Sequence, residues 1–143
     1  MPRKELIEGV LTNSVIGAFY EVYNTLGFGF LEHTYEMALE RELLSRGHRV
    51  ARQVAVMIWY KEHELGIQRV DMVVDEKLLV EIKSTYELHK AANRQVFNYL
   101  KATRLEVGLL LHFGPAPRFF RHICTNTNPP HPFNPPNPVD PLT

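Results

Sequence analysis

The spacing of hydrophobic residues changes several times along the chain, and each change indicates a new element. Residues 15–26 carry apolar side chains at helical spacing, and the pattern predicts a second helix over 31–46, ending at Gly47. Both alternating sets of residues from Val54 to Tyr60 are mainly apolar, which predicts a well-buried strand. Further along the chain, the pattern predicts strands at 67–74 and 78–82, a helix at 89–101, a central strand at 107–113 and an edge strand at 119–124.

This order of elements predicts a mixed α/β domain. The first three strands read as an antiparallel meander, and the helix that follows them predicts a crossover to a parallel strand. Residues 1–124 are expected to form this domain, with a modest core. Residues 125–143 are rich in proline and are expected to form an extended, disordered tail, because proline cannot propagate helix or sheet ladders.

Composition restricts the classes of function only weakly. The chain has 16 Lys+Arg and 16 Asp+Glu residues, so the zero net charge does not itself favour nucleic-acid binding. A local basic face remains compatible with this total, because an acidic metal site would cancel basic residues in the sum. Cys124 is the only cysteine, which excludes an intrachain disulfide and suits the cytoplasmic location that we expect. No stretch approaches the ~20 apolar residues of a membrane span, so we expect no membrane association.

Candidate chemistry centres on two neighbouring predicted strands. Asp71 interrupts an otherwise apolar strand, where an unpaired carboxylate would be costly. Glu81 and Lys83 are two residues apart at the end of the next strand, so their side chains share one face. A Mg²⁺ ion bound to the carboxylates would offset the energetic cost of burying their charge. Mg²⁺ prefers hard oxygen ligands and keeps several waters. We therefore predict that Asp71 and Glu81 bind Mg²⁺, together with the backbone carbonyl of Ile82.

Such a centre would hydrolyse a phosphodiester. The metal would activate a bound water and neutralise a phosphate oxygen, with Mn²⁺ as a possible substitute. Lys83 would position or deprotonate the water, or stabilise the pentavalent phosphorus. The alternative for Glu81 and Lys83 is a solvated ion pair of little energetic value, which is the usual role of a Glu-x-Lys sequence.

Two other features have both a structural and a functional interpretation. Glu32 opens the second predicted helix, where a carboxylate is favoured by the helix dipole whether or not it serves a site. Gln95 and Tyr99 are four residues apart on one helical face. They are either a buried tyrosine with a polar neighbour, or residues that contact the phosphate backbone or steer Lys83.

The stretch from about Ile16 to Ile123 resembles the GxxExxY family, a RecB-like branch of the PD-(D/E)XK nuclease superfamily. Gly29, Glu32 and Tyr35 match the motif that names the family. The other matching positions follow in order and at approximate spacing: Gly47, Gln53, Tyr60, Asp71, residues 81–83, residues 95–99 and residues 108–114. His112 departs from the pattern, because an asparagine is more usual there.

The resemblance implies a restriction-endonuclease-like core, with a mixed central β-sheet flanked by helices. It implies Asp71, Glu81 and Lys83 as the nuclease triad and Glu32 as a further carboxylate at the metal. It also implies Gln95 and Tyr99 as the auxiliary, substrate-binding motif of RecB-like nucleases.

The expected function is therefore a Mg²⁺-dependent nuclease that acts on DNA. One alternative is a non-catalytic module that keeps the fold and binds nucleic acid or protein. Another is a hydrolase of small phosphate esters, which would need a closed cavity rather than an open groove. The short core suggests that a homodimer or a partner protein assists substrate binding.

Overall fold

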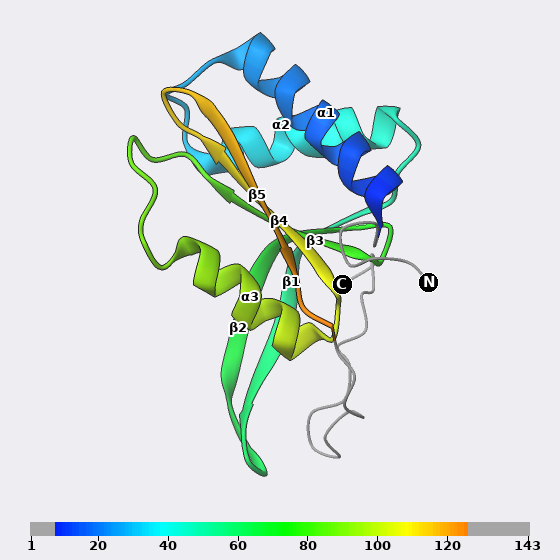
Figure 1. The fold of residues 1–143 in the computed structure, drawn as a ribbon, viewed down its shortest axis with the longest axis vertical. Coiled ribbons are helices and arrows are strands. Elements are labelled where there is room, and N and C mark those ends of the chain that lie inside the picture. Colours follow the sequence, from blue (N-terminus) through cyan, green and yellow to red (C-terminus); the bar gives the residue numbers. More distant parts are fainter. Residues whose placement is uncertain (1–7, 126–143) are drawn as a thin grey trace.

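The computed structural model describes residues 8–125 and shows a layered α/β domain (Figure 1). The eight elements predicted from the pattern are all present within these residues. They are α1 (Gly9–Leu26), α2 (Glu32–Ser45), β1 (Val50–Tyr60), β2 (His63–Val74), β3 (Leu78–Lys83), α3 (Ala92–Thr103), β4 (Val107–Phe113) and β5 (Pro117–Ile123). The proline-rich tail lies outside the described residues, apart from its first residue.

The strands form one sheet in the order β1-β2-β3-β4-β5. The first three strands pair antiparallel, β3 pairs parallel with β4 and β5 returns antiparallel. The predicted crossover is confirmed, since α3 connects the two parallel strands. Every residue of β4 is buried, as expected for a central strand, and β5 closes the edge beside it.

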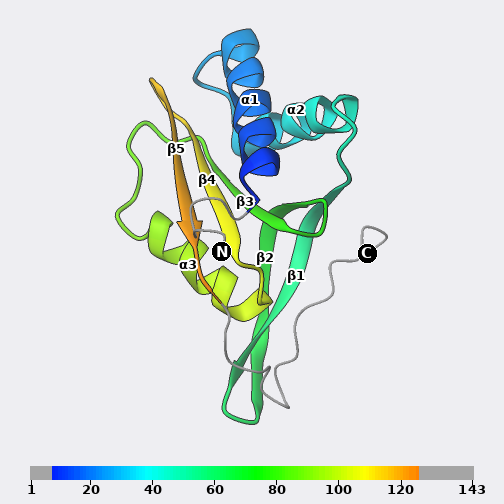
Figure 2. The ribbon, with the colours of Figure 1, turned by 45° about the vertical axis from the view of Figure 1, so that its right-hand side comes forward.

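Helices cover both faces of the sheet (Figure 2). Apolar side chains of α1 and α2, such as Phe19 and Leu39, pack with Met72, Val80 and Leu109 on one face. The inner side of α3 packs on the other face, where its buried residues are Ala92, Val96, Tyr99, Leu100 and Thr103. Within residues 8–125, none of these helices is both long and apolar enough to cross a membrane.

The hairpin of β1 and β2 shows that one prediction was wrong. Residues 54–60 were expected to form a well-buried strand, but burial in β1 is confined to Ala51, Val54 and Val56. The reason is that β3 pairs with β2 only over residues 72–74, so the outer parts of β1 and β2 project from the sheet as a two-stranded ribbon. Apolar side chains such as Tyr60 and Leu65 are exposed there.

The predicted start of α3 was also wrong. The helix begins at Ala92 rather than at residue 89. His89 instead organises the turn before the helix, because its ring Nδ1 accepts a hydrogen bond from the Ala91 N–H at 3.0 Å. The Ala92 N–H bonds to the His89 carbonyl, also at 3.0 Å. His89 is therefore a loop residue with a fixed ring orientation.

Candidate active site

The strands β2 and β3 separate where their two acidic residues lie. Their ladder runs from Val74–Leu78 to Met72–Val80, and Asp71 and Glu81 would form the next opposed pair. Side chains take over the backbone hydrogen bonds at this point. The Asp71 N–H donates to Glu81 Oε1 at 2.9 Å, and the Ile82 N–H donates to Asp71 Oδ2 at 2.7 Å. The fork between the strands thus fixes both carboxylates next to each other.

On its other side, β2 meets an irregular residue of β1. Regular pairing passes from Arg52–Met72 to Val54–Val70 and skips Gln53, which lies opposite Asp71. Gln53 has a left-handed backbone, with φ of 52°, which is uncommon for a residue other than glycine. Its side-chain amide donates to Glu36 Oε1 at 3.0 Å and Oε2 at 3.2 Å. Through this kink in β1, Gln53 therefore links α2 to the strands that carry Asp71 and Glu81.

Glu32 and Glu36 bring two more carboxylates to this region from one face of α2. Tyr35 sets where the helix begins: its hydroxyl donates to the Gly27 carbonyl and accepts the Phe30 N–H. Its ring also stacks on Phe113, with the ring centroids 4.2 Å apart. Tyr35 thus has a structural role, because its hydroxyl and its buried ring fix the helix turn that carries Glu32.

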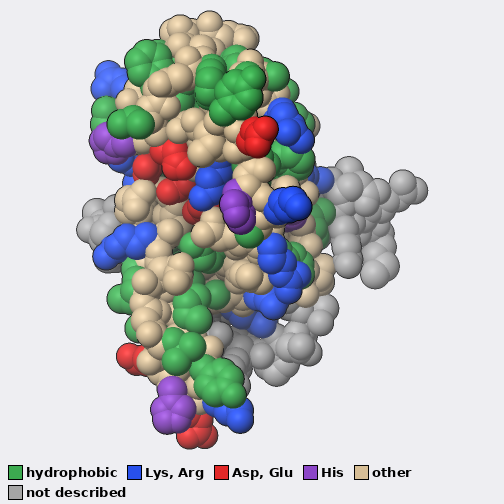
Figure 3. Space-filling view, turned by 90° about the vertical axis from the view of Figure 1, so that its left-hand side faces the viewer, with side chains coloured by type: hydrophobic (Ala, Val, Ile, Leu, Met, Phe, Trp, Pro, Cys, Tyr) green, Lys and Arg blue, Asp and Glu red, His purple; other side chains and the backbone are tan. Residues whose placement is uncertain are grey.

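Burial and repulsion between carboxylates favour the protonated forms of Glu81, Asp71 and Glu32. Burial, followed by the charge of Asp71, raises the pKa of Glu81 to about 8. Burial also raises the pKa of Asp71 and of Glu32, and Glu36 pushes both in the same direction. The charge of Lys83 opposes each of these shifts. On the face shown in Figure 3, acidic side chains gather beside Lys, Arg and His side chains.

The donor set at the fork suits a hard divalent cation. Asp71 and Glu81 each use one oxygen for a backbone hydrogen bond, which leaves a second oxygen on each as a potential ligand, although the Gln53 side chain also interacts with the Asp71 carboxylate. The main chain of Ile82 already borders the carboxylates. Mg²⁺ needs only one or two protein carboxylates, because it keeps several waters. Within the part of the chain that the structure describes, no group of three or more His, Cys, Asp or Glu side chains is arranged to hold a metal.

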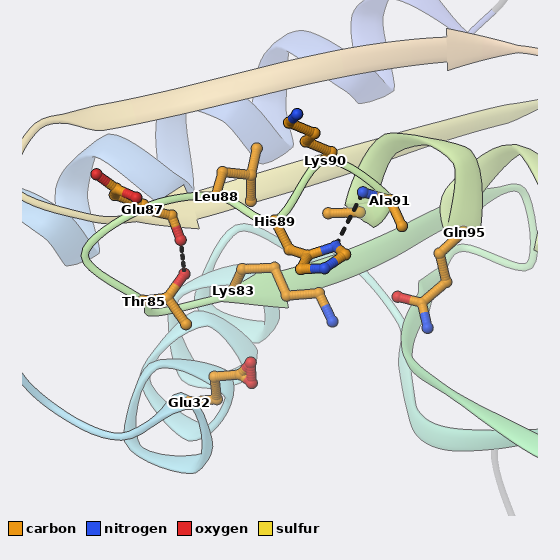
Figure 4. A pocket seen from close by; sticks show the side chains of 10 residues that line it. Glu32, Lys83, Thr85, Glu87, Leu88, His89, Lys90, Ala91 and Gln95 are labelled. Atoms are coloured by element: carbon orange, nitrogen blue, oxygen red, sulfur yellow. Dashed lines mark hydrogen bonds between the residues drawn. The ribbon is translucent and has the colours of Figure 1, made fainter.

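Lys83 extends from the end of β3 into a cavity of about 860 Å³ (Figure 4). Glu32 lies below it, and the His89 ring and Gln95 lie on the α3 side. The cavity thus gives solvent a route to Lys83. His112, beside Lys83 on β4, is buried and hydrogen-bonds the Thr85 carbonyl through Nε2 at 2.7 Å. This contact fixes the loop that follows Lys83.

Gln95 and Tyr99 approach the same region from α3. Gln95 Nε2 donates to the Tyr99 hydroxyl at 3.2 Å, and that hydroxyl donates to Gln68 Oε1 at 3.3 Å. Burial raises the pKa of Tyr99, and the charges of Glu81 and Asp71 raise it further. Tyr99 is buried, whereas Gln95 lines the cavity. Contact of either residue with a substrate stays a prediction.

The structure adds residues to the site that the sequence interpretation left out. Glu36 on α2 is only 6% exposed and bonds to both Gln53 and Arg52. Its spacing of four residues from Glu32 was the available signal, since such residues share a helix face. Gln53 matched the resemblance by position but had no role assigned to it, because its contact with Glu36 depends on the kink in β1.

Comparison with known proteins agrees with this geometry. A family model described as the PD-(D/E)XK nuclease superfamily matches residues 10–122, and the chain belongs to this superfamily. Its mixed sheet flanked by helices is a restriction-endonuclease-like fold. None of the curated proteins matches the chain.

Among solved structures, "Crystal structure of SSO0001" is similar at 17% identity and a TM-score of 0.49. The match covers 87% of this chain and 63% of that one, so this chain spans less than two thirds of that protein's length.

Proposed function

We propose that this protein is a metal-dependent nuclease that hydrolyses phosphodiester bonds in DNA. Membership of the PD-(D/E)XK superfamily supports a nuclease-type function. The observation that carries the proposal is the fork at Asp71 and Glu81, with Lys83 two residues further along β3 and directed into an open cavity. The GxxExxY motif supports placement in the RecB-like branch.

The residues at the fork have distinct roles in this proposal. Asp71, Glu81 and the Ile82 carbonyl would hold Mg²⁺ or Mn²⁺, and Glu32 would hold one of its waters or act as a further ligand. When bound, the cation would supply charge neutralisation at the phosphate and activation of water. The Lys83 ammonium holds the attacking water or a non-bridging phosphate oxygen. Gln95 offers an amide donor to the phosphate from the opposite wall of the cavity.

The environment of Lys83 argues against a simple surface ion pair with Glu81. Among the described residues, no carboxylate forms an ion pair with Lys83. Glu81 is instead only 3% exposed and bonded to the backbone of β2. A lysine without a fixed partner beside buried acids is suited to bind an anion that enters the cavity.

The second candidate is a non-catalytic module that binds nucleic acid or protein. It is favoured by one observation, namely that no group of three metal-ligating side chains is assembled within residues 8–125. The nuclease would cleave nucleic acid, whereas the module would bind its partner without cleaving it. The test is incubation of labelled single- and double-stranded DNA and RNA with Mg²⁺, Mn²⁺ or EDTA, using the wild type and Asp71→Asn.

The nuclease proposal expects cleavage that needs the divalent metal and that Asp71→Asn reduces by at least about 100-fold. Binding without cleavage of any polymer would support the module instead. Cleavage in EDTA, or equal cleavage by Asp71→Asn, would mean that another centre is responsible.

We also propose that the protein acts in the cytoplasm and as a homodimer or with a partner protein. The single cysteine and the polymer substrate support the location. The exposed Tyr60, Leu65 and Ile67 on the projecting ribbon support an additional contact, because apolar side chains gathered on a surface favour association. Light scattering that finds only monomer at working concentration would reject self-association.

A further inference from the structure

A groove separates α3 from the ribbon of β1 and β2 and leads into the cavity of the candidate active site. Its volume is about 600 Å³. Ala91 and Gln95 line both the groove and the cavity, so the two hollows meet at the first turn of α3. A chain molecule held in the groove would therefore pass directly towards Lys83.

The charge of the groove is suited to a polyanion. Arg94 and Lys101 line it, and no Asp or Glu is among the described residues that do so. The two cations lie seven residues apart on α3, about 10 Å along the helix axis. Both contact the ring of Phe97, with Arg94 Cζ at 5.0 Å and Lys101 Nζ at 5.7 Å from its centroid. Phe97 thus holds the two positive charges in a row along the helix.

The opposite wall offers an aromatic surface, and neutral amides lie on both walls. Trp59 lines the groove from the ribbon and is partly exposed. Gln68 and Asn98 lie on the two walls and can bond to base edges. Aromatic side chains stack on the faces of bases, and those faces are available only where the bases are unpaired. In a duplex the same faces are covered by neighbouring pairs.

We infer that this groove binds a single-stranded segment of nucleic acid, with phosphates at Arg94 and Lys101 and a base stacked on Trp59. The inference rests on the proposed function only in assigning the strand to the substrate of the active site. Neither basic residue belongs to the set proposed to cleave the bond, so binding and cleavage can be measured separately.

Trp59 provides a direct readout, because it is the only tryptophan in the chain. The full-length protein is titrated in EDTA, which prevents metal-dependent cleavage, with an oligothymidylate and with a blunt-ended duplex of the same length. The inference expects the single strand to quench Trp59 fluorescence and the duplex to quench it far less. Quenching by the duplex equal to that by the single strand, or no quenching by the single strand, would overturn it.

Variants test the two kinds of contact, with affinity followed by the anisotropy of a labelled oligothymidylate. Arg94→Gln and Lys101→Gln are each expected to lower the salt slope of log affinity by about 0.7, as expected for one phosphate contact to a single strand. Trp59→Leu should weaken binding by about 10-fold while the salt slope is retained, because a stacking contact is lost. Lys77→Gln, an exposed change in the β2–β3 turn, is the matched charge control and should change neither quantity.

The outcome also separates this inference from the nuclease proposal. Metal-dependent cleavage without binding of the single strand in the groove would overturn the inference and leave the nuclease intact. Trp59 quenching with the expected salt slopes, but without cleavage of any polymer, would support the groove and reject the nuclease. Unchanged affinity in Arg94→Gln, Lys101→Gln and Trp59→Leu would place the bound strand elsewhere and overturn the inference.

Discussion

The carboxylates of Asp71 and Glu81 are tied to each other's strands. The Asp71 N–H bonds to the Glu81 side chain, and the Ile82 N–H, directly after Glu81, bonds to the Asp71 side chain. The two acids thus hold the strands together where the regular ladder ends. They do so at an electrostatic cost, because both are shielded from water and face each other. This electrostatic cost predicts how Glu81→Gln and added Mg²⁺ change the stability of the protein.

Glu81→Gln is expected to stabilise the metal-free protein at high pH. The pKa of Glu81 is raised to about 8 in the folded state from 4.5. Between these values the folded protein holds a proton that the unfolded chain has lost, so the free energy of unfolding falls as pH rises, and the loss is complete above the folded pKa. Glutamine can accept the same hydrogen bond without this charge. We expect a gain of roughly 1–4 kcal/mol at about pH 9 and little change at about pH 4.

Urea denaturation in EDTA at both pH values measures this effect. If the variant and the wild type lose stability in parallel as pH rises, the assignment of the charge cost to Glu81 is wrong.

Addition of Mg²⁺ is expected to reverse this cost in the wild type. A cation that binds only the folded state raises the free energy of unfolding by about 2.7 kcal/mol at 100 times its dissociation constant. The gain should increase with pH towards about 8, because the metal competes with the proton on Glu81. Thermal melts with and without Mg²⁺ provide the measurement. Glu81→Gln should show little gain, and an equal gain in both proteins would locate the metal elsewhere.

Tyr35→Phe tests whether the motif tyrosine acts by positioning Glu32. The change removes the hydroxyl that binds the Gly27 carbonyl and the Phe30 N–H but keeps the ring stacked on Phe113. We expect a loss of about 1–3 kcal/mol in stability, because two partly buried backbone hydrogen bonds are lost. Cleavage should fall more than binding of the oligonucleotide. Tyr86→Phe, at an exposed tyrosine, is the control and should be neutral in both measurements.

Asp75→Asn is expected to destabilise the domain at neutral pH, and to do so less as the pH falls. Burial of Asp75 opposes its ionisation, but hydrogen bonds from the Arg49 N–H and from His48 outweigh this effect and hold the pKa of Asp75 below its usual value. His48 also bonds Ser14, so the chain of contacts joins α1 to the β2–β3 turn. A depressed folded pKa gives stability that is present above the unfolded value and lost as pH falls through the folded one.

The predicted cost of Asp75→Asn is about 1–3 kcal/mol at pH 7, diminishing towards about pH 2. Guanidinium denaturation at a series of pH values measures it. A cost that is the same at every pH would show that packing, rather than the charge of Asp75, is responsible.

The order and type of the elements were predictable from the sequence, because each change in hydrophobic period reports local geometry. The parallel pairing of β3 with β4 followed from the connecting helix. The projecting ribbon was not predictable, because β1 remains apolar where burial ends, and only the short ladder between β2 and β3 explains its exposure. The start of α3 was misplaced because His89 favours a turn through its own ring nitrogen.

The positions of the acidic residues of the site were predictable, but the hydrogen bonds that tie them to each other's strands were not. Asp71 stood out in an apolar strand, and the spacing of Glu81 and Lys83 gave their shared face. The reciprocal hydrogen bonds at the fork depend on where two strands diverge, which no local pattern records. The burial of Glu36 likewise depends on a backbone kink at Gln53, 17 residues along the chain.

Cleavage by Lys83→Ala tests the central claim most directly. The measurement is single-turnover cleavage of labelled DNA in Mg²⁺, with purified wild type, Lys83→Ala and the exposed-lysine control Lys77→Ala, each checked for its fold by circular dichroism. The account predicts a loss of at least about 100-fold for Lys83→Ala and wild-type cleavage for Lys77→Ala. Equal, metal-dependent rates for wild type and a folded Lys83→Ala would contradict the assignment of this cavity as the site of cleavage.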